Sequence, residues 1–239
     1  MPYRVFQLKD VAEYLHIARG DIEELVRRGE IPFERQGDRV IFRKKEVDSW
    51  ASQRILGLSG KGLTAYHKTS SAKMHDLSKK HAILPELLKL EFIDPALTSK
   101  TKSSVVRDMV KLACRTGLVP DPADLVRSLD ERERLGSTAL AGGIALLHPK
   151  NHEPYMFDDS LVVVGRSIQP IPFGSPDGAT TDLFFLVCCQ DDRIHLHVLA
   201  RLCMMCHYTS LLLELREAPD VHGMFAALMG AENEVIQQL

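Results

Sequence analysis

The stretch that decides the fold of this protein is RERLGSTALAGGIALLHPK, residues 132–150. It begins with an arginine-led polar segment that reaches the Gly-Ser-Thr tripeptide 136–138, and it ends with the apolar run 143–147 directly before His148. A short apolar run bounded by glycine and proline is typical of a buried strand. We therefore predict a strand over 143–147 that delivers a histidine at its end.

The region around this stretch, from residue 83 onward, alternates helical and strand-like apolar patterns. Such interleaving over about 150 residues predicts one mixed sheet flanked by helices, an α/β (α+β) fold. The spacing predicts helices over 105–113, 123–129 and 195–208 with amphipathic helices after them, and further strands over 161–164 and 183–187.

The first 50 residues show a different organisation, with short elements and many charges. Two short helices joined by a tight turn, a hairpin and a closing helix are predicted. The corresponding residues are 6–17 for the first helix, a break at 18–20, 22–26 for the second helix, 31–42 for the hairpin around Gly37-Asp38, and Val47 with Trp50 on one face of the closing helix.

The net charge of −2 hides three regions of different charge. Residues 1–50 hold 10 basic and 10 acidic side chains, residues 51–82 hold 6 and 1, and residues 83–239 hold 14 and 21. The middle block is also rich in glycine, serine and lysine, which predicts a flexible basic linker over 56–82 between domains at 1–55 and 83–239. Its function is either that of a solvated tether or that of an arm that follows a phosphate backbone.

From the sequence we expect neither a membrane-spanning protein nor a secreted one. No apolar stretch approaches the roughly 18 residues of a membrane helix, and the start lacks the apolar core of a secretory signal, so a cytoplasmic location is expected. Five cysteines without an export signal predict reduced thiols, and the string Cys-x-x-Cys-His at 203–207 continues a helical pattern, which favours buried thiols over haem attachment. His195 and His197 point about 200° apart on a helix. We therefore expect neither a metal nor a cofactor.

The helix, turn, helix, hairpin and closing helix over residues 4–54 resemble the winged helix-turn-helix of the MerR and excisionase family. The resemblance implies that the second helix enters a DNA major groove and that the wing contacts phosphates. The resembling family is usually dimeric, which favours a homodimer but leaves the oligomeric state open. It implicates six basic residues, Arg19, Arg27, Arg28, Arg35, Arg39 and Arg43. The second helix departs from the family pattern because it carries Asp21, Glu23 and Glu24, and carboxylates are repelled by phosphates. A protein-docking or dimerising module is therefore the alternative to direct DNA binding.

The region 83–232 resembles the enzyme IIA domain of the fructose, mannitol and nitrogen-regulatory branch of the bacterial sugar phosphotransferase system. The resemblance rests on the stretch 132–150, on the Asp-Gly turn within 170–178 before the strand at 182–187, and on the helical segment 195–202 with its leading histidine. It implies that the protein exchanges phosphoryl groups with the histidine-containing phosphocarrier protein.

The resemblance also assigns roles to residues. It implies that His148 accepts the phosphoryl group, for which the imidazole must be neutral so that a ring nitrogen has its lone pair. We assign stabilisation of the phosphoryl charge to His195, to Arg132 and to the backbone or hydroxyl groups of Ser137 and Thr138. The sequence departs from the family at three positions, with Leu147 in place of proline and with Ala139 and Ala141 in place of glycines.

These observations lead to one main hypothesis and two alternatives. The main hypothesis is a cytoplasmic regulator in which phosphorylation of His148 controls DNA binding by the N-terminal domain. The first alternative is a phosphocarrier that regulates a protein partner and uses the N-terminal module for docking or dimerisation. The second is a binding module that is not phosphorylated, because of the changes at Leu147, Ala139 and Ala141.

Overall fold

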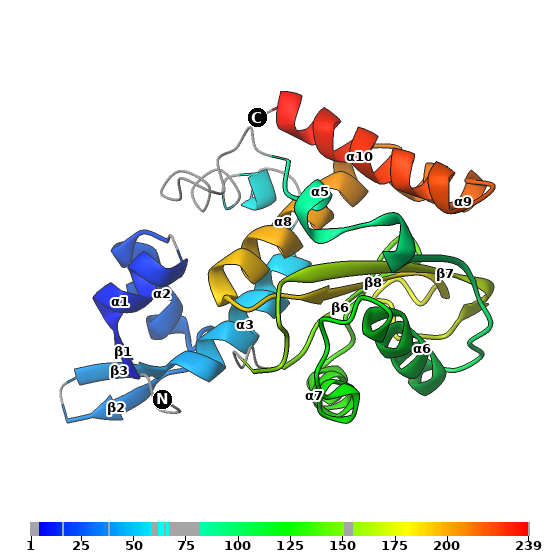
Figure 1. The fold of residues 1–239 in the computed structure, drawn as a ribbon. Helices are drawn as coiled ribbons and strands as arrows, with labels where there is room; N and C mark the ends of the chain where they lie inside the picture. The colour runs from blue at the N-terminus through cyan, green and yellow to red at the C-terminus, as the bar shows by residue number, and fades with distance from the viewer. Residues whose placement is uncertain are drawn as a thin grey trace.

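A computed structural model describes residues 5–15, 17–37, 39–58, 62–64, 66, 82–150 and 155–238 of the chain. The described residues form an N-terminal module with a small sheet and a larger C-terminal domain built on a five-stranded sheet (Figure 1). Most of the predicted basic linker over 56–82 lies outside the described residues, so that segment stays a prediction.

The N-terminal module has the predicted order of helix, turn, helix, hairpin and helix, preceded by a short strand that the sequence did not indicate. Its three strands pair in the antiparallel order β1-β3-β2. The elements are β1 Val5–Gln7, α1 Leu8–Leu15, α2 Arg19–Arg28, β2 Glu34–Gln36, β3 Arg39–Arg43 and α3 Lys44–Leu56.

Two predicted boundaries in this module are wrong. The first helix was expected over 6–17, but residues 6 and 7 belong to β1, and α1 spans Leu8–Leu15. The break was expected at 18–20, but Arg19 and Gly20 already belong to the first turn of α2, which follows Ala18 in extended backbone. At its other end α2 stops at Gly29, whose φ of 70° is the left-handed conformation that glycine adopts without a steric cost.

The C-terminal domain contains the mixed sheet predicted from the sequence, in the strand order β4-β7-β8-β6-β5. The pairs β4–β7 and β6–β8 are parallel, whereas β7–β8 and β5–β6 are antiparallel. The strands are β4 Ile93–Leu97, β5 Ala139–Leu140, β6 Ile144–Leu147, β7 Leu161–Ile171 and β8 Thr181–Cys188. The helices are α5 Leu84–Leu87, the 3-10 turn η1 Leu90–Phe92, α6 Lys102–Cys114, α7 Pro122–Arg134, α8 Asp192–Tyr208, α9 Leu211–Glu217 and α10 Val221–Gln237.

Helices cover both faces of this sheet (Figure 1). Helices α6 and α7 lie on one face, and α5, α8 and α10 lie on the other. The central strands are buried on both sides, which explains their continuous apolar sequence. The predicted strands over 143–147, 161–164 and 183–187 are confirmed, as are the three helices, while β4 was missed because Pro95 interrupts its pattern. Proline is tolerated there because β4 is an edge strand.

The described residues contain no single helix that combines the length and the hydropathy of a membrane span. The segments Ile194–Tyr208 and Leu211–Glu217 reach both together, but an 81° bend separates them.

Candidate functional site

The topology of the sheet brings two histidines to one edge. Strands β6 and β8 are parallel neighbours, with Leu147 opposite Leu186, so their carboxyl ends lie together. His148 follows β6 immediately, and the chain that leaves β8 turns into α8, which carries His195 in its first turns. The two imidazole rings lie with their centroids 5.0 Å apart.

Hydrogen bonds define the orientation of His148. Its Nδ1 lies 2.9 Å from the carbonyl oxygen of Leu146, and its Nε2 lies 2.9 Å from Nε of Arg132. The carbonyl can only accept and the guanidinium can only donate. The proton of a neutral His148 ring therefore sits on Nδ1, and the lone pair sits on Nε2.

Arg132 supplies a buried positive charge next to that lone pair. It lies in the last turn of α7, its side chain is 1% exposed, and its Nη1 donates to the carbonyl of Gly136 at 3.0 Å. Its Nη2 has no hydrogen-bond partner among the described residues. Burial lowers the pKa of Arg132, and the negative charge of Glu133 opposes this shift. A buried guanidinium with an unused donor favours binding of a planar or tetrahedral oxyanion.

The two hydroxyl residues of the predicted site make other contacts. Ser137 Oγ donates to the carbonyl of Phe173 at 2.8 Å, and the Thr138 hydroxyl bonds to the carboxylate of Glu133. Glu133 also pairs with Lys102, with 2.7 Å between Nζ and Oε2. The structure therefore brings His148, His195 and Arg132 together, while both hydroxyls belong to a neighbouring polar network.

Two of the three departures from the family pattern lie in buried strands, and the third, Ala141, is exposed in the turn between β5 and β6. Leu147 is fully buried as the last residue of β6, and Ala139 lies in the extended strand β5, where a side chain is accommodated. In the turn between β5 and β6, the left-handed positions are occupied by glycines, Gly142 with φ 92° and Gly143 with φ 79°. The turn that presents His148 thus keeps the glycines it needs.

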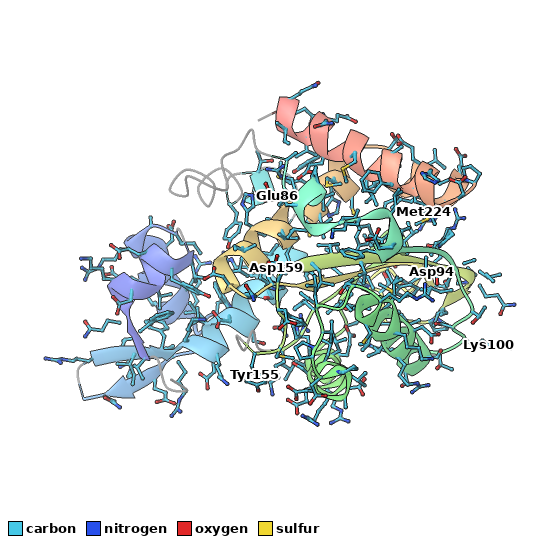
Figure 2. The ribbon with its side chains drawn as sticks, in the orientation of Figure 1. Glu86, Asp94, Lys100, Tyr155, Asp159 and Met224 are labelled. Carbon is cyan, nitrogen blue, oxygen red and sulfur yellow. The ribbon has the colours of Figure 1, made fainter. Side chains whose placement is uncertain are left out.

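Sequence reasoning missed one residue of this site, Ser52. It comes from α3 of the N-terminal module, and its Oγ lies 3.5 Å from Nε2 of His195. A contact across 143 positions between two domains leaves no local signal in the sequence, so no spacing rule could have found it. Helix α3 packs against α8 at this end of the sheet. Tyr155 and Asp159 lie at the same end, away from Asp94 and Lys100 (Figure 2).

The basic residues predicted to contact DNA lie on α2 and the wing. On α2, Arg19 pairs with Glu23, and both Arg27 and Arg28 pair with Glu24 of the same helix. On the wing, Arg43 pairs with Glu34, whereas the side chains of Arg35 and Arg39 are exposed. The arginines of the second helix are thus already paired with the carboxylates that distinguish this helix from the family pattern.

A second buried polar cluster lies inside the C-terminal domain, behind α8. Arg201 and Glu232 are both almost fully buried and pair across 3.1 Å, and Glu232 accepts the backbone N–H groups of Ile83 and Leu84 at 2.9 and 3.0 Å. His197 lies in the same interior, where burial and the charge of Arg201 lower its pKa to about 3. This cluster ties α8 and α10 to the beginning of the domain.

Comparison with known proteins identifies both parts of the chain. The family described as phosphoenolpyruvate-dependent sugar phosphotransferase system, EIIA 2, matches residues 86–229, and a helix-turn-helix domain family matches residues 5–55. The nitrogen regulatory protein of Bradyrhizobium diazoefficiens is 28% identical over 148 residues, which cover 61% of this chain and 94% of that protein. That of Escherichia coli is 30% identical over 122 residues, which cover 49% of this chain and 71% of that protein.

Solved structures agree with these matches. The nitrogen regulatory protein IIA-Ntr of Neisseria meningitidis superimposes with a TM-score of 0.56 at 25% identity, covering 62% of this chain and 99% of that chain. For IIA mannitol of Escherichia coli the TM-score is 0.53 at 21% identity, with coverage of 59% and 98%, which shows a shared fold. The predicted α/β fold and the winged helix-turn-helix module are thereby confirmed. The chain belongs to the EIIA type-2 family of the phosphotransferase system and carries a helix-turn-helix domain in front of its EIIA domain.

Proposed function

We propose that His148 accepts a phosphoryl group from the histidine-containing phosphocarrier protein in the cytoplasm, and that this modification controls DNA binding by the N-terminal module. The observation that carries the proposal is the environment of Nε2. The Leu146 carbonyl holds the ring proton on Nδ1, so Nε2 has the lone pair, and the buried Arg132 lies 2.9 Å away.

The transfer step balances with the groups at hand. The Nε–H of Arg132, which donates to Nε2 of His148 in this structure, first releases the lone pair of that nitrogen. The lone pair then forms the new N–P bond while the N–P bond of the donor's phosphohistidine breaks, and the donor nitrogen keeps that electron pair. The proton of His148 stays on Nδ1 throughout, where it is donated to the Leu146 carbonyl. Arg132 balances the charge of the moving phosphoryl group, with its unused Nη2 as a further donor.

The proposed output is DNA binding through α2 and the wing. A helix-turn-helix domain family matches this module, and its exposed Arg35 and Arg39 lie on the two strands of the wing, where phosphate contacts are made in such modules. We expect binding to DNA whose affinity falls with rising salt, as neutralisation of phosphates requires. A gel-shift assay with phosphorylated and unphosphorylated protein tests the coupling, and equal affinities of the two forms would contradict it.

A second candidate function is supported by the ion pairs of α2. Because Arg19, Arg27 and Arg28 pair with glutamates of their own helix, α2 offers less unpaired positive charge than a DNA-reading helix needs. The module then serves for docking to a protein or for dimerisation, and the output of the domain is a protein partner. Competent phosphorylation together with no salt-sensitive DNA binding would favour this function.

The first experiment measures the intact mass of the full chain after incubation with phosphoenolpyruvate, the general phosphotransferase enzyme and the phosphocarrier protein. We expect an acid-labile gain of one phosphoryl group in the wild type and none in His148→Ala. His207→Ala is the matched control, since His207 is an exposed histidine of α8, and it should gain the group like the wild type. No gain in any form would refute the acceptor role and leave a binding module that is not phosphorylated.

A further inference from the structure

The N-terminal module contributes a helix to the site of the C-terminal domain. Helix α3 packs against α8, and Ser52 on α3 is only 4% exposed. Its Oγ donates to the carbonyl of Asp48 at 3.1 Å and lies 3.5 Å from Nε2 of His195. The next residue, Gln53, brings its amide nitrogen within 3.9 Å of the place where a Cβ on Gly136 would lie. Two neighbouring residues of α3 therefore reach both α8 and the segment that follows Arg132.

The result is a closed site. His148, His195 and Arg132 are each about 1% exposed in the structure, in which α3 packs against α8 beside His195. In-line transfer needs the phosphorus of the donor within roughly 3–3.5 Å of Nε2, with the leaving nitrogen behind it. A donor that is itself a protein must therefore place its own phosphohistidine against His148. A donor protein cannot contact the His148 ring while that ring is about 1% exposed.

Helix α3 is also firmly attached to its own module. Strand β3 of the wing ends at Arg43, and α3 begins at the next residue. The Tyr14 hydroxyl of α1 donates to Asp48 on α3 at 2.6 Å, and the Trp50 indole nitrogen donates to the carbonyl of Glu30, just after α2, at 2.5 Å. A movement of α3 away from α8 therefore either carries the helix-turn-helix module with it or breaks these bonds.

We propose, resting on the acceptor role of His148, that α3 and the phosphoryl donor compete for the same surface. The unphosphorylated chain is closed by its own N-terminal module, and a phosphoryl group reaches His148 only after α3 has left the site. The competition couples the two domains through direct contact, because the helix that closes the site is the helix that supports the wing. It also makes the rate of phosphorylation depend on the contact at Ser52.

The test is the accessibility of His148 in the full-length protein, measured with diethyl pyrocarbonate. This reagent carbethoxylates accessible unprotonated imidazoles, and peptide mass spectrometry assigns the modified residue. The exposed His207 is an internal reference. We expect Ser52→Phe, which overpacks the contact, to raise the rate at His148 by about fivefold or more. Arg54→Phe puts the same ring on an exposed position of α3 and should leave that rate unchanged.

A second variant keeps the test valid if Ser52→Phe does not fold. Ser52→Arg places a good helix former on α3 and puts a charged side chain into the buried contact with His195. The cost of burying that charge opens the contact while α3 keeps its helical preference. It should raise the rate at His148 in the same direction, with Trp50 fluorescence and circular dichroism at their wild-type values. A wild-type His148 that reacts as fast as His207 would overturn the proposal. So would rates at His148 that are equal in the wild type and in a folded Ser52→Arg variant.

Phosphorylation kinetics then separate this proposal from the proposed function. If both hold, Ser52→Arg gains the phosphoryl group faster than the wild type, and Arg54→Phe matches the wild type. If no form gains a phosphoryl group but carbethoxylation of His148 still depends on Ser52, the acceptor role fails and the closure stands. If the wild type and Ser52→Arg gain the group at equal rates and are carbethoxylated equally, the acceptor role stands and the closure fails.

Discussion

Replacing Arg132 by methionine tests the chemistry of the site most directly. Arg132→Met retains an unbranched side chain that fills part of the same space. It removes the hydrogen bond from Nε to His148 and the hydrogen bond from Nη1 to the Gly136 carbonyl. Loss of one donor aimed at developing charge typically lowers a rate by about 10²–10³, which corresponds to roughly 2.7–4 kcal/mol of transition-state stabilisation. We expect a fall of that size in the rate at which His148 is phosphorylated.

The effect on folding should be much smaller. Removing a buried cation relieves its desolvation, while the Gly136 carbonyl loses its partner, and these changes oppose each other to within about 1–2 kcal/mol of the free energy of unfolding. The assay is a quenched time course followed by intact mass. Arg134→Met, at an exposed position of the same helix turn, is the control for net charge. Arg132→Lys keeps the charge without the forked donors and should give an intermediate rate. A rate for Arg132→Met within roughly threefold of the wild type would refute the reasoning.

Three further predictions concern stability, each checked by urea unfolding followed by circular dichroism. Glu232→Ala leaves the charge of Arg201 buried without its carboxylate and should cost about 3–5 kcal/mol, and a cost below about 1 kcal/mol would contradict the importance of the pair. Because the pKa of His197 is lowered to about 3, the unfolded chain binds more protons below about pH 6.5, so stability should fall by about 2 kcal/mol between pH 6.5 and pH 5 in the wild type. His197→Leu should remove that part of the pH dependence, and an unchanged slope would show that another group causes it. Gly143→Ala forces a φ of 79° on alanine, and its Cβ would lie 2.6 Å from Nη2 of Arg216, 3.0 Å from Oδ1 of Asp182 and 3.2 Å from the carbonyl of Thr180. The Arg216–Asp182 ion pair must therefore shift, and the substitution should cost about 1–3 kcal/mol, whereas a neutral effect would argue against this turn geometry.

The fold was largely predictable because its central strands and long helices have strong apolar patterns. The runs before His148 and within β8 are buried on both faces, so their sequence is continuously apolar and bounded by turn residues. The elements that were missed are short or lie at an edge, as β4 with Pro95 and the two-residue β5 do. Their backbone is held by pairing with a neighbouring strand, which a local pattern does not record.

The parts of the site that lie close together in the sequence could be predicted, whereas the part that depends on how the two domains pack could not. The segment around Arg132 and the strand before His148 are close in the chain, so their relation could be inferred. The contact between Ser52 and His195 depends on how α3 packs against α8, which is determined by the complete tertiary structure. The hydroxyls of Ser137 and Thr138 could be located by sequence, but their hydrogen bonds to Phe173 and Glu133 depend on partners that only the structure reveals.

The position of α3 has a genetic consequence. Helix α3 makes contacts in both domains. Its Asp48 accepts a hydrogen bond from Tyr14 of its own module, and Ser52, one turn later, contacts His195 of the other domain. Alleles in this helix will therefore separate into two classes by position along the turn. Changes at Asp48 will weaken the module while leaving the other domain folded, and changes at Ser52 will alter the behaviour of the second domain in a chain whose first domain is intact.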